Sequence, residues 1–177
     1  AYSYLGLDGP ADLSPIAEPS SNVRDVCQRS GRKVTNLLSV WGPCVRPELA
    51  ETVVPHVGEL LSMLSDTHDL VIVDTSSDWG DEAAATAQMC DRLILVSDER
   101  AGAIGSLSRA AALAVRLGVA RTRIMRVMNR CDRRHRDEGF LARADVGLET
   151  ARSFRVLDGD VEVAELLSAG HALDLAK

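Results

Sequence analysis

Three polar positions that directly follow apolar segments are the candidates for chemistry in this sequence. They are Asp74, the pair Ser97 and Asp98, and Asn129. An acid at the carboxyl end of a buried strand holds Mg²⁺, directly or through water, in proteins that hydrolyse nucleotides. An amide offers one donor and one acceptor, which is the pattern needed to contact the edge of adenine. Asp74 therefore indicates a magnesium site, and Asn129 indicates a base-binding site.

Each of these positions also has a purely structural explanation. Asp74 can end a strand and cap the turn that follows, and Asn129 can cap a turn as well. For either residue taken alone, the structural explanation is favoured, because many α/β domains contain similar segments. A shared site becomes more credible if the segments are neighbouring parallel strands, because the carboxyl ends of such strands open onto one crevice.

The hydrophobic pattern predicts strands that alternate with helices. The continuous aliphatic run at 70–74 is typical of a strand buried on both faces, whereas the spacing at 104–117 is typical of a helix. The predicted strands are 36–41, 70–74, 92–97, 124–128 and 154–157, and the predicted helices are 23–28, 47–65 with a break at Pro55, one from Asp81, 104–117 and 161–169. This alternation predicts a three-layer α/β fold, with a mostly parallel sheet flanked by helices.

Composition argues against several classes of protein. The 177 residues are 46% hydrophobic, which suits one domain with a substantial core. Residues 1–35 are expected to form an irregular N-terminal segment, and residues 36–177 the domain itself. The net charge of −6 argues against a protein that is basic throughout, and no apolar run reaches the roughly 20 residues that span a bilayer. The four cysteines are widely spaced, which disfavours a zinc site and predicts reduced thiols in a cytoplasmic protein.

The order of these segments resembles the ParA/MinD superfamily of P-loop ATPases. The resemblance rests first on three segments, which are 70–74 (LVIVD), 90–96 (CDRLILV) and 125–130 (MRVMNR). The tail at 156–173 and the segment 38–50 are similar to further parts of the same family. Within the superfamily, the sequence is most similar to the CpaE/TadZ branch, which is associated with Tad pilus assembly, and to septum-site-determining-like proteins.

The resemblance, which covers roughly residues 36–175, implies roles for particular positions. Asp74 would be the Walker B aspartate, which places Mg²⁺ through its water shell. Asn129 would contact the base, while Leu157 and Asp158 would line the adenine pocket. The implied cofactors are ATP and Mg²⁺, and the implied assembly is a homodimer.

Two features depart from the family pattern. The loop 75–80 would be switch II, which senses the γ-phosphate, yet it lacks the family's proline and reaches a glycine only at Gly80. The sequence also contains no G-x-x-x-x-G-K-[ST] motif, whose amides and lysine hold phosphates. We expect that the chain is part of a longer polypeptide, so that its P-loop NTPase-like fold is incomplete at the N-terminus. The alternative is a fold rebuilt without that strand.

These features lead to competing hypotheses about function. The leading one is a bacterial, ATP-dependent switch of the ParA/MinD type that organises a pilus, secretion or septum apparatus through its protein components. The alternative is a catalytically inactive scaffold of the same fold, and a third is an unrelated Rossmann-like enzyme. The arginine-rich stretch 121–136 could contact DNA, but no aromatic residues interleave to stack on bases, so DNA binding is not favoured. ATPase activity is expected only if a P-loop lies upstream of residue 1.

Overall fold

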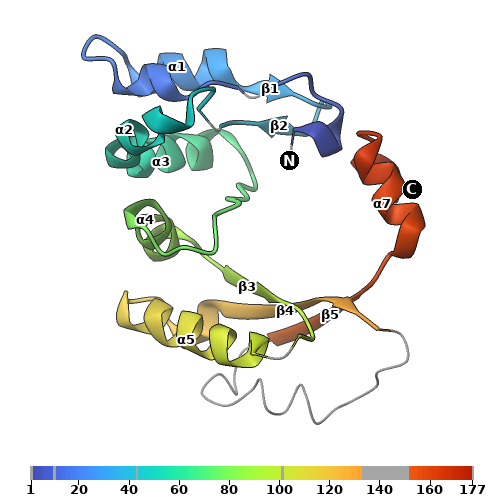
Figure 1. The fold of residues 1–177 in the computed structure, drawn as a ribbon. Coiled ribbons are helices and arrows are strands. Elements are labelled where there is room, and N and C mark those ends of the chain that lie inside the picture. Colours follow the sequence, from blue (N-terminus) through green and yellow to red (C-terminus); the bar gives the residue numbers. More distant parts are fainter. Residues whose placement is uncertain (1, 10, 43, 101, 133–151, 177) are drawn as a thin grey trace. The chain divides into compact units, whose positions relative to one another are not determined.

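The computed structural model describes residues 2–9, 11–42, 44–100, 102–132 and 152–176 (Figure 1). The chain divides into two compact units, 1–86 with 160–177, and 87–159, and each is described by itself. None of the helices in these described ranges has the length and apolar character that crossing a bilayer requires. In chain order the elements are η1 (Ser3–Leu5), η2 (Ser14–Ala17), α1 (Val23–Ser30), β1 (Arg32–Lys33), β2 (Ser39–Val40), η3 (Pro47–Leu49), α2 (Ala50–Val53), η4 (Val54–His56), α3 (Val57–Thr67), α4 (Asp81–Met89), β3 (Leu93–Ser97), α5 (Ala103–Arg116), η5 (Arg121–Arg123), β4 (Ile124–Cys131), β5 (Arg152–Leu157), α7 (Asp160–Ser168) and η6 (Ala172–Ala176).

The first unit is built around a small helical core. The side chain of Asn22 accepts a hydrogen bond from the main-chain N–H of Arg24, which caps α1, the helix predicted at 23–28. Pro55 lies in the short 3₁₀ turn η4, and the long helix α3 begins after it, so the predicted break is confirmed. The apolar residues buried together are Leu13, Ile16, Val23, Val26, Cys27, Cys44, Val53, Leu60, Met63 and Leu64.

The predicted strand at 36–41 is much shorter than expected. Only β2, at Ser39–Val40, is a strand, and it pairs antiparallel with β1 rather than joining a parallel sheet. The preceding residues turn back on themselves, because the amides of Val34 and Thr35 both donate to the carbonyl oxygen of Leu38. The apolar pattern was therefore partly that of an exposed turn, in which Leu37 is 99% exposed.

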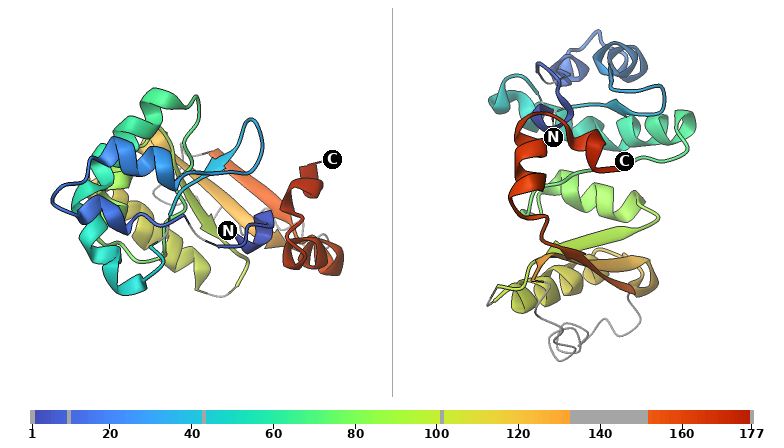
Figure 2. Two further views of the ribbon diagram at one scale, coloured as in Figure 1. Left: turned by 90° about the horizontal axis from the view of Figure 1, so that it is seen from above. Right: turned by 90° about the vertical axis from the view of Figure 1, so that its right-hand side faces the viewer.

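The second unit contains a three-stranded sheet in the order β3-β4-β5, and both strand pairs are parallel. The strands lie side by side, and α5 lies along one face of the sheet (Figures 1 and 2). The side chains of Leu107, Ala111 and Ala114 on α5 are buried, as the helical spacing predicts. A parallel sheet with a helix packed on it confirms the α/β class.

The two faces of this sheet differ in burial. Arg126 on β4 lies opposite Leu95 on β3, and both side chains are buried on one face. The neighbouring positions on β3, Ile94 and Val96, are 52% and 64% exposed, and Phe154 on β5 is 45% exposed. Alternation along a strand places these three side chains on the opposite face. One face of the sheet is therefore buried and includes Arg126, whereas the other face carries exposed apolar side chains.

The prediction of a buried strand at 70–74 is wrong, because the structure describes these residues and assigns them to no strand. The segment belongs to neither sheet, and Leu70 and Ile72 are 76% and 82% exposed. A strand needs a neighbour to receive its main-chain hydrogen bonds, and the sheets formed by the described residues supply none here. The aliphatic composition of this segment therefore did not determine its burial.

The end of the chain follows the prediction closely. The expected helix at 161–169 is α7, and Gly170 ends it in the left-handed conformation with φ +79°. A Cβ on Gly170 would lie 2.9 Å from the Cα of Gly6, so the close approach of two backbones also requires glycine.

The division between residues 1–35 and 36–177 stays a prediction.

Candidate base-binding edge of the parallel sheet

The carboxyl end of β4 is irregular at the residue predicted to contact the base. Met128 pairs with Arg155 and Cys131 pairs with Leu157, so the register between β4 and β5 shifts across the two residues in between. Asn129 and Arg130 therefore lie opposite a single residue of β5, as at a β-bulge. Bulges redirect side chains, so this one breaks the regular alternation at Asn129, which is half-buried.

Arg130 has a backbone conformation that is unusual for its residue type. Its φ is 55°, in the left-handed region that side chains with a Cβ rarely adopt. Such conformations cost about 1–3 kcal/mol and persist when the surrounding structure determines them, often at functional sites. The backbone beside Asn129 is thus held in place by contacts elsewhere in this unit.

Three of the four predicted site residues are brought together. Cys131, two residues after Asn129, is the register partner of Leu157. The main-chain N–H of Asp158 donates to the carbonyl oxygen of Cys131 at 3.1 Å, which extends the pairing beyond the last residue of β5. Asn129, Leu157 and Asp158 accordingly lie on adjoining strand ends, where parallel sheets bind ligands.

Asp74, the fourth predicted residue, is in the first unit and is exposed. It precedes a turn in which Ser76 Oγ donates to the carbonyl oxygen of Asp78 and accepts from its amide, both at 3.3 Å. An exposed carboxylate can carry the water shell through which Mg²⁺ is commonly held. The structure therefore leaves Asp74 accessible, although it is not part of a strand.

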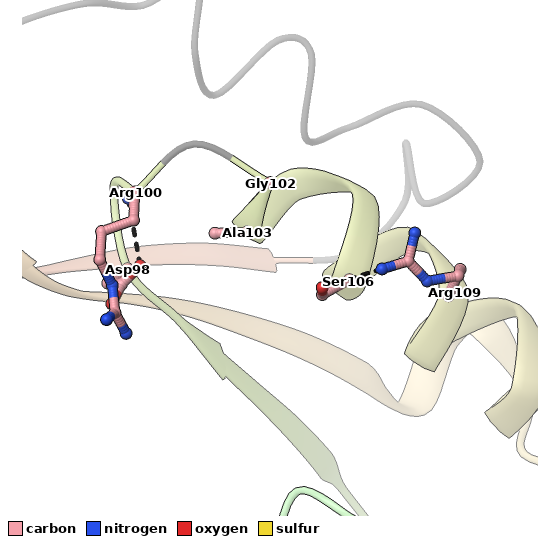
Figure 3. Close-up of a pocket in the computed structure, with 6 residues that line it drawn as sticks. All are labelled: Asp98, Arg100, Gly102, Ala103, Ser106 and Arg109. Carbon is pink, nitrogen blue, oxygen red and sulfur yellow. Dashed lines mark hydrogen bonds and ion pairs between the residues drawn. The ribbon is translucent and has the colours of Figure 1, made fainter.

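The loop after β3 contains a separate shallow pocket (Figure 3). Arg100 pairs with Asp98. The main cause that lowers the pKa of Asp98 is the hydrogen bond from the Arg100 amide. Across the pocket, Arg109 donates to Ser106 Oγ at 3.0 Å. The pocket is lined by Asp98, Arg100, Gly102, Ala103, Ser106 and Arg109, and none of the four predicted site residues is among them. Asp98 thus stabilises the loop through its contacts with Arg100, as the structural explanation for an acid at a strand end predicts.

Glu99 is a residue that the sequence did not single out. Its carboxylate accepts hydrogen bonds from the main-chain N–H of Asp132 at 3.1 Å and from Arg155 Nη2 at 3.3 Å. It follows β3, whereas Asp132 comes directly after β4 and Arg155 lies within β5. The only sequence signal was its position two residues after a predicted strand, which is too common to identify a role.

The arginine-rich stretch is only partly a surface feature. The guanidinium-bearing side chain of Arg126 is 1% exposed and lies in the sheet. Arg121 and Arg123 form the short turn η5 that precedes β4. Arg133, Arg134 and Arg136 lie outside the described residues.

The residues that the structure brings together fit an adenine base better than they fit phosphates. An amide at a half-buried strand end can supply the paired donor and acceptor, and the half-exposed Leu157 can supply an apolar surface for the ring. For phosphate binding, the 177-residue sequence lacks the glycine-lysine motif. For Mg²⁺, the fit rests on the accessible carboxylate of Asp74.

Comparison with known proteins gives a match in structure but not in sequence. No protein-family model matches the chain, and no curated protein is significantly similar to it. The chain is similar to the crystal structure of a ParA family ATPase from Chlorobium tepidum TLS, with a TM-score of 0.78 and 18% sequence identity. The match covers 99% of this chain and 74% of that one. The chain therefore has an α/β fold of the kind seen in a ParA family ATPase.

Proposed function

We propose that this chain forms the base-binding and magnesium-binding part of an ATP-dependent switch of the ParA/MinD type. The single observation that carries the proposal is the arrangement of Asn129, Leu157 and Asp158 on two adjoining parallel strand ends. The likeness in fold to a ParA family ATPase supports it. Asn129 would hold the adenine edge, Leu157 and Asp158 would line the pocket, and Asp74 would hold Mg²⁺ through water.

The chemistry that the cofactor brings is a transferable γ-phosphate, neutralised by Mg²⁺. The residues of this chain would bind and orient the base, and the carboxylate of Asp74 would orient water around the ion. On this proposal the protein works in the bacterial cytoplasm as a homodimer. Its nearest relatives in role would be the CpaE/TadZ proteins, so its partners would be components of a pilus, secretion or septum apparatus.

A second candidate function is a scaffold that does not hydrolyse ATP. The specific observation in its favour is exposed aliphatic surface within one segment, since Leu70 and Ile72, two residues apart, are 76% and 82% exposed. Exposed apolar side chains that are close together are typical of protein contact sites.

Binding of a fluorescent ATP analogue to the intact protein separates the two functions. For the switch, we expect Mg²⁺-dependent binding that Asn129→Ala weakens, whereas Asp74→Ala removes the dependence on Mg²⁺. The matched control is Asp78→Ala, which removes an exposed acid from the same loop. Wild-type protein that shows no Mg²⁺-dependent binding at millimolar nucleotide would rule out the switch and favour the scaffold.

A further inference from the structure

Glu99 connects the ends of all three strands of the parallel sheet. It lies in the loop after β3, accepts from the amide of Asp132 directly after β4, and accepts from the guanidinium of Arg155 within β5. Each of its two carboxylate oxygens takes one of these bonds, with Oε2 on Asp132 and Oε1 on Arg155. One side chain therefore ties together the three chain segments that form this edge.

Along the chain, these contacts lie just after one candidate base-binding residue and just before another. Asp132 is three residues after Asn129, and Arg155 is two residues before Leu157. Between Asn129 and Asp132, the chain passes through Arg130 in its left-handed conformation. Because that conformation is unfavourable for arginine, it needs restraints on the chain that follows it. The bond from Asp132 to Glu99 is one such restraint, and the bond from Asp158 to Cys131 is another.

The charge of Glu99 strengthens this arrangement. The hydrogen bond from the Asp132 amide, aided by the Cys131 side chain and by the nearby Arg155, holds the pKa of the Glu99 carboxyl below its usual value. Hydrogen bonds to an ionised acceptor are stronger than bonds between neutral groups. The side chains of Glu99 and Arg155 are 25% and 31% exposed, so solvent screens the pair only in part.

We propose that Glu99 is a positioning residue for the base site, which fixes the backbone after Asn129 relative to β5 without itself touching the nucleotide. The inference rests on the proposed function, because it assigns Glu99 a role in the same site. It predicts that loss of the carboxylate acts through Asn129, so that discrimination between bases is lost together with affinity.

The test compares wild-type protein with Glu99→Gln, Glu99→Ala and the control Asp91→Asn. Asp91→Asn removes the same charge from an exposed side chain just before β3, at the opposite end of that strand. Affinities for ADP and GDP are measured on the intact protein by displacement of a fluorescent ATP analogue. Glu99→Gln removes the charge and one of the two acceptor oxygens, and Glu99→Ala removes both, so ADP binding should weaken about tenfold or more in each variant. The preference for ADP over GDP should fall by a similar factor, and Asp91→Asn should change neither.

Repeating Glu99→Gln in an Asn129→Ala background tests whether Glu99 acts through Asn129. The effect of Glu99→Gln on base preference should then disappear, whereas two independent roles would leave it intact and overturn the proposal. Amide exchange at Asp132 should become faster in both Glu99 variants. If Glu99→Ala does not fold, the isosteric Glu99→Gln alone decides.

The outcomes separate the two proposals. Wild-type protein that binds no ADP removes the proposed function, and the positioning role falls with it. Wild-type protein that binds ADP, with Glu99 variants that keep the affinity and the base preference, overturns the positioning role only. A lowered unfolding midpoint with unchanged base preference would show that Glu99 is merely structural.

Discussion

Gly31 lies directly against the indole ring of Trp41. A Cβ at Gly31 would be 2.9 Å from the Cε2 and Nε1 atoms of that ring, closer than real Cβ contacts. The indole cannot easily move away, because its Nε1 donates to the carbonyl oxygen of Cys27 at 2.9 Å. The ring also meets His68 edge-on, with 5.1 Å between the centroids. The aromatic side chain thus joins the end of α1 to the residues after α3, and the size of Gly31 permits it.

Gly31→Ala should destabilise the protein by about 1–3 kcal/mol, because the added methyl forces the indole away from Cys27. The matched control is Gly9→Ala, since an added Cβ there would meet no atom within 4 Å. Urea unfolding of both variants measures the difference in the free energy of unfolding. Equal stability of the two variants would contradict the close packing of Trp41.

Replacing Arg130 should reveal the cost of its positive φ. Arg130→Gly should change the free energy of unfolding by less than about 1 kcal/mol, because glycine adopts this conformation readily. Arg130→Val should lower it by about 2 kcal/mol more than the glycine variant does, since a β-branched residue is strained at φ 55°. The same unfolding measurement applies, and a valine variant as stable as the glycine variant would argue against the left-handed conformation.

Asn129→Asp tests the contact with the base more sharply than removal of the side chain does. Aspartate keeps the acceptor oxygens but loses the amide donor, so adenine can be contacted through only one kind of hydrogen bond. Affinity for ADP should fall by about 1–3 kcal/mol in binding free energy. Competition assays with ADP and the fluorescent analogue measure this, and an unchanged affinity would show that the amide does not contact the base.

The stability of the first unit should depend on pH through Asp12. Partial burial raises the pKa of Asp12, but hydrogen bonds from the amides of Ser14 and Val45 outweigh it, so the pKa lies below the ordinary 3.8. A carboxyl with a depressed pKa in the folded state stabilises above the unfolded pKa, and this stabilisation is lost as pH falls through the folded value. The free energy of unfolding of the wild-type protein should therefore exceed that of Asp12→Asn above about pH 3.8, and this difference should disappear at lower pH. Unfolding curves at several pH values would contradict this if the difference stayed constant.

Two adjacent residues on β3 should respond very differently to truncation. Leu95→Ala should cost about 2–5 kcal/mol of stability, because this side chain is buried on the inner sheet face. Val96→Ala should cost about 1 kcal/mol or less, because its side chain is 64% exposed on the other face. Chemical denaturation of the two variants measures both values, and the reverse order would mean that the faces are assigned wrongly.

The sequence predicted the bounds of two elements in the second unit closely. The helix α5 and the strand β3 were expected within a residue or so of their bounds, since their apolar spacing determines which side is buried. The segment 70–74 has an equally clear pattern, yet it forms no strand among the described residues. Strand formation depends on a neighbouring strand, which the pattern of one segment cannot reveal.

The candidate site was predictable in its residue types but not in its geometry. Asn129 was identified because an amide at a strand end is chemically suited to a base and because the order of segments resembles that of the ParA/MinD superfamily. The shift in register that places Arg130 at positive φ arises from pairing with β5, more than twenty residues further along the chain. Glu99 was missed for the same reason, because its importance lies in contacts with residues that are distant in sequence.

The exposed side chains of Leu70, Ile72 and Val73 also have a consequence for solubility. A short, uncharged aliphatic segment on a protein surface is a typical starting point for aggregation, and flanking charges commonly suppress it. Here the flanking charges are those of Asp69 and Asp74, both of which are exposed. We therefore expect Asp74 to suppress self-association whether or not it binds a metal. Asp74→Ala removes that protection, whereas Asp74→Glu keeps the charge and allows loss of binding to be distinguished from loss of soluble protein.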